Sequence, residues 1–427
     1  MPTTVNEFNT VVPEDIARAV IVDGFADTAD FLAALEWLRE NAPVARVELD
    51  GYDPVWLVTT YDEILEVERQ PEVFSAGGGD RPGTHNPHLI TRAEDDFSLE
   101  TMGTLRAVDS IEYADGDEHS SMKSMTGSWF RPVSLRALEP EVREVADASI
   151  STFLPGTQLD AADVAEFCFS YPLHVIMRVL GESSSYESVY RALVHMPDET
   201  ATAGGLPGDG EAEAGEDSDY WAEVFGNAFA AFDRIIQERR DAPKNDFATV
   251  IASAIDPHTG ERFPDSWIHG WYISLITAGH ATTSRTLAGI LLALATRPEQ
   301  LALVQRDPTC IPGLVSEGLR WVSPIRHFTR RIEQEYVLRG QLLPAGERVV
   351  VYFPSGNRDP AVFTDPDTFD LLRSPNKQIA FGYGMHQCIG QHLARLELRV
   401  VLEELLPLIE SISLDETGGV EIRLTER

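Results

Sequence analysis

The stretch that decides the fold is Phe381-Gly382-Tyr383-Gly384-Met385-His386-Gln387-Cys388-Ile389-Gly390, in which glycines, a histidine and a cysteine stand close together. A helical pattern follows it from Gln391 to Pro407. A thiolate that binds iron needs backbone N–H groups directed at its sulfur, and glycine permits the tight backbone that this requires. A helix that begins directly afterwards brings the positive end of its dipole near the anion. Cys388 is therefore a candidate iron ligand.

Two other interpretations of this stretch are considered. A lone cysteine in a glycine turn is more often a buried structural residue, but the surrounding ten residues favour the iron ligand. A zinc site made by His386, Cys388 and His392 is the second alternative. Tetrahedral zinc needs a fourth ligand or an open water position, and usually a second cysteine close by.

The same ten residues resemble the haem-binding loop of the cytochrome P-450 family, Phe-Gly-x-Gly-x-His-x-Cys-x-Gly, at every specified position. The resemblance implies that Cys388 is the axial ligand of the iron in haem b, iron protoporphyrin IX. A thiolate in this position pushes electron density towards the iron and favours O–O cleavage. It further implies that His386 contacts a haem propionate. The remaining porphyrin contacts that it implies come from Phe381, Gly382, Gly384 and Gly390.

A long helix is expected to begin near Asp265 or Ser266 and to end near Thr296, before Pro298. Because this segment is apolar nearly all round, it should be buried on most sides. It contains Ala278-Gly279-His280-Ala281-Thr282-Thr283, which resembles the oxygen-binding groove of the family. The Thr282 hydroxyl can bond the carbonyl one turn back, at Ala278, and open the helix.

Ala281 departs from the family pattern, since most relatives carry Asp or Glu there to help relay protons towards dioxygen. Without that carboxylate, proton delivery should be slower or less well coupled, by about 100-fold or more if nothing substitutes for it. Thr282 is then the best candidate for this role, and Ala281 and Gly279 complete the expected catalytic segment.

Cationic partners for the haem propionates are expected from two further places. His119 and Lys123 resemble the His-x-x-x-Arg element of the family, with lysine in place of the usual arginine. Arg330 resembles another propionate-binding arginine. For each of these residues the alternative is an ordinary surface base.

Glu317 and Arg320 resemble the Glu-x-x-Arg pair that stabilises the segment before the cysteine loop, and Arg358 lies in a stretch that resembles that segment. The third member of this buried network usually comes from a Pro-acid-Arg-Phe element. The corresponding residues 366–369 are Pro-Asp-Thr-Phe, so the expected arginine is missing. The role of this network is expected to be structural.

The remaining pattern predicts a mainly helical fold with a small β-rich lobe, and the resemblance implies the triangular helical prism of the family in one domain, residues 1–427. The β-rich lobe is expected mainly at 40–75 and 325–360. Expected strands, helices and connections, in chain order, are strands at 45–49 and 55–59, a helix at 61–70, a functional loop at 75–121, helices at 134–180 and 220–240, and a solvated linker or lid at 198–219.

Composition excludes several classes of protein. The formal charge of −35 would repel nucleic acid and anionic membranes. The three cysteines are too few for a disulfide framework, and residues 1–29 lack the basic start and apolar run of a secretory signal. The apolar stretch 274–296 is interrupted by His280 and Arg285, so we read it as a buried helix rather than a membrane span. A cytoplasmic protein without a membrane or nucleic-acid partner is expected.

By resemblance the chain is a haem-thiolate monooxygenase, most similar to the terpineol-hydroxylating subfamily. Its substrates would be O2 and a small hydrophobic molecule, a monoterpenoid or an alkyl-aromatic compound. Electrons would come from NAD(P)H through a ferredoxin reductase and a ferredoxin. The expected docking face for the ferredoxin carries Arg131, Arg136, Arg143 and Arg395.

The substrate pocket is expected to be lined by Leu275, Ala278, Gly279 and Thr282, with contributions from residues 75–110 and from the segment after Ser323. The C-terminal segment 413–427 is too short to include in full the hairpin whose turn touches substrate in relatives. Three alternatives remain open: reduction of nitric oxide, use of peroxide, and a non-catalytic haem-dependent sensor or carrier.

Overall fold

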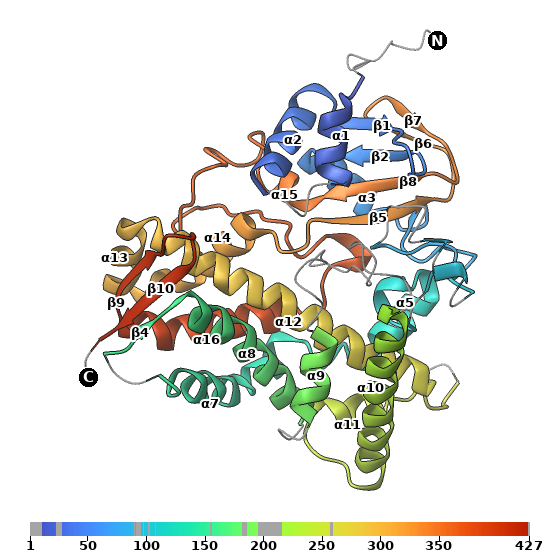
Figure 1. Ribbon diagram of the computed structural model, residues 1–427. Helices are drawn as coiled ribbons and strands as arrows, with labels where there is room; N and C mark the ends of the chain where they lie inside the picture. The colour runs from blue at the N-terminus through green and yellow to red at the C-terminus, as the bar shows by residue number, and fades with distance from the viewer. Residues whose placement is uncertain are drawn as a thin grey trace.

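The computed structural model has a small sheet-rich lobe beside a larger helical lobe (Figure 1). It describes residues 11–22, 28–88, 90, 95–96, 98–100, 103–106, 108–153, 156–181, 186–194, 216–256 and 259–425. The chain is mainly helical, as the sequence predicts. That residues 1–427 form one domain stays a prediction.

The sheet-rich lobe is built around β2, Val55–Val58, whose four residues are all buried. Such a continuous apolar run suits a strand covered on both faces. The strands of this sheet follow the order β1-β2-β8-β5-β3. The partners of β2 are β1 (Val44–Val47) and β8 (Arg348–Tyr352), and β5 (His327–Ile332) then links β8 to β3 (Phe74–Ser75). All lie inside the two ranges expected for this lobe.

Short helices and one hairpin complete this lobe (Figure 1). The helices pack apolar residues against the sheet and leave polar residues outside. The hairpin is β6 (Tyr336–Leu338) with β7 (Gln341–Leu343). The helices are α1 (Glu14–Ile21), α2 (Thr28–Asn41), α3 (Tyr61–Glu68) and α15 (Phe353–Gly356).

The helical lobe surrounds α12, Asp265–Ala295, which runs through the centre of the molecule (Figure 1). Its other helices are α5 (Gly116–Thr126), α6 (Pro132–Arg136), α7 (Glu139–Ile150), α8 (Ala161–Leu180), α9 (Glu187–Val194), α10 (Glu216–Asp241), α11 (Phe247–Ala252), α13 (Pro298–Arg306), α14 (Ile311–Val322) and α16 (Gln391–Leu405). Short 3-10 turns are η1 (Ile111–Tyr113), η4 (Pro308–Cys310), η5 (Gly384–His386) and η6 (Leu406–Leu408).

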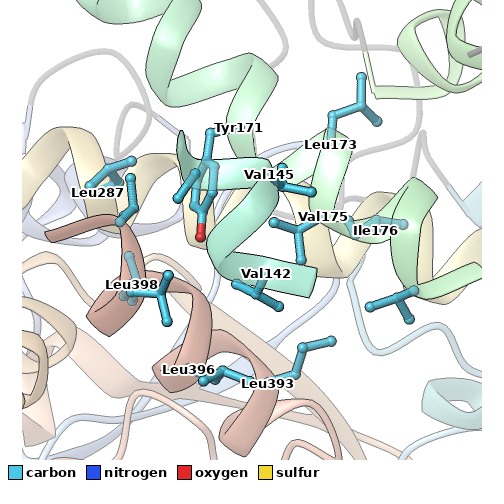
Figure 2. Close-up of a cluster of buried hydrophobic side chains, with 14 of the residues drawn as sticks. Val142, Val145, Tyr171, Leu173, Val175, Ile176, Leu287, Leu393, Leu396 and Leu398 are labelled. Atoms are coloured by element: carbon cyan, nitrogen blue, oxygen red, sulfur yellow. The ribbon is translucent and has the colours of Figure 1, made fainter. Parts of the chain in front are cut away.

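Apolar side chains from α7, α8, α12 and α16 form one continuous core (Figure 2). Leu393, Leu396 and Leu398 of α16 lie opposite Val142 of α7. The hydroxyl of Tyr171, on α8, donates to the backbone carbonyl of Glu397 at 2.9 Å. This packing holds the helix after Cys388 against the helices that enclose α12.

Within the described residues no single helix is long and apolar enough to cross a membrane, although α12 and α13 taken together pass that test and meet at 106°. Helix α12 begins and ends as expected, but Pro264 rather than Asp265 or Ser266 is its N-cap, and no side chain caps it.

Several expected boundaries were wrong. The stretch 134–180 is broken into α6, α7 and α8, and β4 (Gln158–Leu159) interrupts it because it pairs with β10 (Val420–Leu424). The expected loop 75–121 ends earlier, at η1 and the start of α5. The linker expected at 198–219 lies mostly outside the described residues, and its last residues, from Glu216, belong to α10.

Candidate functional site

A large cavity lies between α12, the cysteine loop and the start of β5. It holds about 1510 Å³ of empty space, including the part open to solvent. Most residues singled out in the sequence line it, although they come from segments far apart in the chain. They are His119, Lys123, Leu275, Ala278, Gly279, Thr282, Arg330, Phe381, Gly382, His386, Cys388 and Gly390. Ala281 and Gly384 are not among its lining residues.

The cysteine loop turns back on itself so that Cys388 lies at the cavity wall. The backbone N–H of Cys388 donates to the carbonyl of Phe381 at 2.9 Å. Burial raises the pKa of the Cys388 thiol, whereas backbone N–H groups of Gly390 and Gln391 and the charge of Arg395 act to lower it. The backbone N–H groups at the start of α16 therefore lie near enough to the sulfur to favour its thiolate form.

Gly384 packs closely against another element. It has φ +71°, and a Cβ atom there would lie 2.1 Å from the backbone oxygen of Glu68 in α3. Its missing side chain therefore lets the loop pack against α3. Gly382, with φ +67°, does line the cavity.

The hydrogen bond expected between Thr282 and Ala278 is present, within a helix that is continuous from Asp265 to Ala295. Thr282 Oγ1 donates to the carbonyl of Ala278 at 2.7 Å, and Thr286 Oγ1 donates to the carbonyl of Thr282, also at 2.7 Å. Both threonines line the cavity, directly along the same face as Ala278 and Gly279. The Ala281 side chain is not at the cavity wall, so the expected catalytic segment is reduced to its other members.

Four basic side chains, His119, Lys123, Arg330 and His386, meet at one part of the cavity. The rings of His119 and His386 lie 4.6 Å apart. Lys123 donates to the Met385 carbonyl at 3.1 Å. Burial, together with the neighbouring His386 and Lys123, lowers the pKa of His119 to about 3. This cluster suits an anionic group of a ligand.

Acidic residues hold this basic cluster in place. Arg330 lies 2.9 Å from Glu68 in a buried ion pair. Although burial acts to raise it, the nearby His386 ring and hydrogen bonds from the backbone N–H groups of Ala76, Gly77 and Gly79 lower the pKa of Asp115 to about 2. Sequence reasoning missed Glu68 and Asp115, because neither belongs to a motif and only the tertiary structure brings them to the cluster.

The zinc alternative is wrong. His392 lies with Arg136 and Arg395 in a separate groove and not at the cavity that Cys388 lines. Among the described residues no group of three or more His, Cys, Asp or Glu side chains is arranged to hold a metal ion. A single thiolate is the candidate protein ligand in this cavity.

The Glu317–Arg320 pair is fully buried and bidentate, with both N···O distances at 2.8 Å. Arg320 also donates to the carbonyls of Asn357, Pro366 and Thr368. Arg358 lies nearby and donates to the Trp321 carbonyl at 3.0 Å. Burial and the charge of Arg320 lower the pKa of Arg358 to about 10.

The arginine missing from residues 366–369 is supplied by Arg373. Its Nε lies 3.2 Å from both oxygens of Glu317, and it also donates to the carbonyls of Thr364, Asp365 and Thr368. Sequence reasoning missed it because Arg373 stands outside the family element. An arginine a few residues after Phe369 was the available signal.

Two further carboxyls at the cavity wall were also missed. Glu397 is 2 % exposed, burial raises its pKa well above the ordinary value, and its Oε2 has no hydrogen-bond partner among the described residues. Glu112 accepts hydrogen bonds from Ser274. A glutamate in an apolar helical stretch was the signal for Glu397, whereas Glu112 comes from a loop without a motif.

The C-terminal strands β9 (Ile409–Leu414) and β10 are joined directly by a short turn at 415–419, and β10 also pairs with β4. No described residue after Leu398 lines the cavity. Within the described residues, β9 and β10 therefore lie outside the cavity wall.

Two of the arginines expected on the docking face line a groove on the other side of the cysteine loop. Arg136 and Arg395 share it with Arg399. Arg131 is exposed beside it, next to Val133, whose exposed fraction is 75 %. Arg143 differs, because Glu139, Glu403 and Glu404 bind it in ion pairs.

Comparisons with known proteins agree with this geometry. The model of the family "Cytochrome P450" matches residues 310–411. The chain is 36 % identical over 412 residues to "Cytochrome P450-terp" of a Pseudomonas species, covering 94 % of this chain and 93 % of the relative. It is 29 % identical to a "Steroid C26-monooxygenase" of Mycobacterium tuberculosis, covering 92 % and 90 %. The crystal structure of CYP108D1 from Novosphingobium aromaticivorans matches with a TM-score of 0.84 at 31 % identity, covering 98 % and 100 %.

Proposed function

The chain belongs to the cytochrome P450 family of haem b monooxygenases, and we propose that it hydroxylates a small hydrophobic molecule with electrons supplied by a ferredoxin. The observation that carries this proposal is the position of Cys388 in the same cavity as the Ala278–Thr282 groove. A cysteine that can bind the iron and a threonine hydroxyl on α12 therefore line one cavity, as oxygen insertion by this family requires.

The residues present fit haem b. Cys388 offers one thiol beside backbone N–H groups that favour its thiolate form, and the cations Lys123 and Arg330 lie with the rings of His119 and His386 at one part of the cavity, where propionates would bind. The Nε2 atom of His386 is buried without a hydrogen-bond partner among the described residues, though it lies 3.6 Å from Asp115. We propose that Cys388 binds the iron and that the four bases hold the propionates.

When bound, the haem supplies the iron at which dioxygen is activated and one oxygen atom is inserted into the substrate. Thr282 can present its hydroxyl at the groove while its hydrogen bond to Ala278 keeps the side chain in one orientation. Because Ala281 carries no acid, we propose that Thr282 directs protons through its hydroxyl. Glu397, on the helix that follows Cys388, is a second carboxyl group at the cavity, and burial raises its pKa well above the ordinary value.

The cavity wall near Leu275 and Phe328, which we call the distal wall, is mainly apolar, and this supports a small, mainly apolar substrate. Its apolar members are Pro87, Ile111, Phe130, Ile176, Leu275, Pro324, Ile325 and Phe328. Such a wall binds hydrocarbon surface by removing it from water. The printed name of one relative, P450-terp, adds support for a monoterpenoid. A monoterpenoid or alkyl-aromatic compound is therefore our proposed substrate class.

We further propose that a ferredoxin docks over the groove at Arg136 and Arg395, where Arg399 is already paired with Glu139 and Glu403. Positive charge near the cysteine loop favours the docking of a ferredoxin. The exposed apolar side chain of Val133, beside the groove, adds contact area. Arg143 is removed from the expected docking set, because three glutamates already neutralise it. The prediction of a cytoplasmic location stands unchanged.

The first test is an absorbance titration of the purified ferric protein with monoterpenoids and alkyl-aromatics. A saturable shift from low to high spin is expected as a ligand displaces water from the cavity. The Cys388→Ser variant should bind haem without the thiolate spectrum, whereas Cys310→Ser, outside the cavity, should match wild type. A thiolate spectrum that no member of either compound class shifts would contradict the proposed substrate.

A further inference from the structure

The carboxylate of Glu112 lies among the apolar side chains of the distal wall. Glu112, in η1, accepts a hydrogen bond from Ser274 Oγ of α12, with Oε2 at 2.9 Å and Oε1 at 3.2 Å. Both residues line the cavity. Ser274 precedes Ala278 by four residues, which places it about 6 Å away along the helix axis. This polar pair therefore lies one helical turn from the groove.

Glu112 has unused capacity as an acceptor. A carboxylate offers about four lone-pair positions. In the described part of the chain, Ser274 is the only residue that donates to Glu112, and no Lys, Arg or His forms an ion pair with it. The other carboxylate on this side, Glu68, is already paired with Arg330. A carboxylate in an apolar wall gains from a further hydrogen-bond donor.

A donor without an acceptor lies on the same face of α12. Trp271, three residues before Ser274, lines the cavity and is 4 % exposed. Residues at this spacing are neighbours on one face of a helix. The Nε1–H of Trp271 is buried and has no hydrogen-bond partner among the described residues. Leaving a buried N–H unpaired is unfavourable, so a ligand oxygen that reached it would relieve this cost.

We propose that Glu112, Ser274 and Trp271 form a polar anchor that binds a hydroxyl group of the substrate. A hydroxyl both donates, to Glu112, and accepts, from Trp271, whereas an ammonium group only donates and a carbonyl only accepts. The anchor holds one end of the molecule a helical turn from Ala278 and Thr282, so the carbon presented there is several bonds from the hydroxyl. This inference rests on the proposed function and narrows its substrate to alcohols.

The test compares four ligands with one carbon skeleton: limonene, perillyl alcohol, perillaldehyde and perillyl amine. Dissociation constants are measured by calorimetry on the haem-loaded protein, and absorbance spectra identify any titration in which the amine binds the iron. Wild type should bind the alcohol most tightly. Glu112→Leu should reduce the preference for alcohol over limonene by about ten- to hundredfold, because hydrogen bonds to charged groups are strong.

Two more variants keep the test independent of one substitution. Trp271→Phe keeps an aromatic side chain but removes the N–H group, and Ser274→Ala removes the hydroxyl. Both variants should weaken alcohol binding and leave limonene binding unchanged. The matched control is Glu118→Leu. Glu118 holds Arg106 at 2.9 Å, beside the same loop, but does not line the cavity.

Equal changes for all ligands in Glu112→Leu and Glu118→Leu would mean that Glu112 only fastens the loop, and would overturn the anchor. Tighter binding of limonene, aldehyde or amine than of alcohol in wild type would overturn it while leaving the proposed function intact. If no ligand bound while the thiolate spectrum persisted, the proposed substrate class would fail together with the anchor.

Discussion

Arg373 donates from Nε to both carboxylate oxygens of Glu317, 3.2 Å away in each case, across 56 positions of sequence. Arg320 binds the same carboxylate from the other side, and Asn376 donates to it at 3.0 Å. The buried carboxylate therefore ties α14 to the segment that leads into the cysteine loop. The position of Cys388 depends on this network although none of its members touches the cavity.

Substitution of Arg373 by leucine should destabilise the protein by about 1.5 to 3 kcal/mol, because Glu317 keeps its pair with Arg320 but loses the hydrogen bonds from Arg373. Urea unfolding measures the change. Arg423→Leu is the control, since its pair with Glu410 is exposed and should contribute less than about 1 kcal/mol. Equal effects of the two substitutions would show that Arg373 does not support the network.

Thr282→Ala should uncouple electron consumption from hydroxylation. Without the hydroxyl that Ala278 orients, the product formed per NAD(P)H should fall by up to about 100-fold, and hydrogen peroxide should rise. Thr277→Val is the matched control, because Thr277 bonds the Ile273 carbonyl in the same way but lies outside the cavity. Unchanged coupling in Thr282→Ala would contradict the assigned role.

Glu397→Gln should raise stability at neutral pH. The pKa of Glu397 is raised in the folded protein. Its full contribution to the free energy of unfolding is therefore present below its pKa in the unfolded chain, near 4.5, and is lost as pH rises. A neutral glutamine avoids that loss, so the two proteins should differ at pH 8 and converge near pH 4.5. Thermal unfolding across this range measures the difference. A constant difference at every pH would argue against a protonated Glu397.

Acid should destabilise the protein through buried histidines. Burial lowers the pKa of His88 to about 3 and that of His327 to about 4, so the unfolded chain binds their protons first as pH falls below about 6.5. Each should remove up to about 1.4 kcal/mol per pH unit between pH 6.5 and its folded pKa. His88→Gln should make the decline shallower in urea unfolding between pH 7 and 4. An identical slope in the variant would contradict this.

Arg136→Glu should raise the KM for ferredoxin several-fold at low salt, and the effect should shrink as salt screens the groove. Steady-state kinetics with ferredoxin as the varied component measure it. Arg423→Glu reverses an exposed charge outside the groove and should leave the KM unchanged. An equal rise in KM for both variants would mean that the net charge of the protein, and not docking at this groove, determines the KM.

Local chemistry made the haem loop and the long helix predictable. The order of glycines, histidine and cysteine in residues 381–390 requires a particular tight backbone, and the apolar run of α12 requires burial. The hydrogen bond from Thr282 to Ala278 was predictable too, because both partners lie one turn apart in one helix. Interactions within one element leave a pattern that can be read along the chain.

The tertiary structure alone decided which distant side chains meet. Arg373 replaces an arginine absent from its usual place, Glu68 pairs with Arg330, and Glu112 reaches Ser274 across 162 positions. The sequence by itself determined the family, the thiolate ligand and the central helix, because those depend on local backbone geometry. Long-range ion pairs and cavity walls depend on how elements pack, and side chains that share no periodicity or motif carry no local signal of that packing.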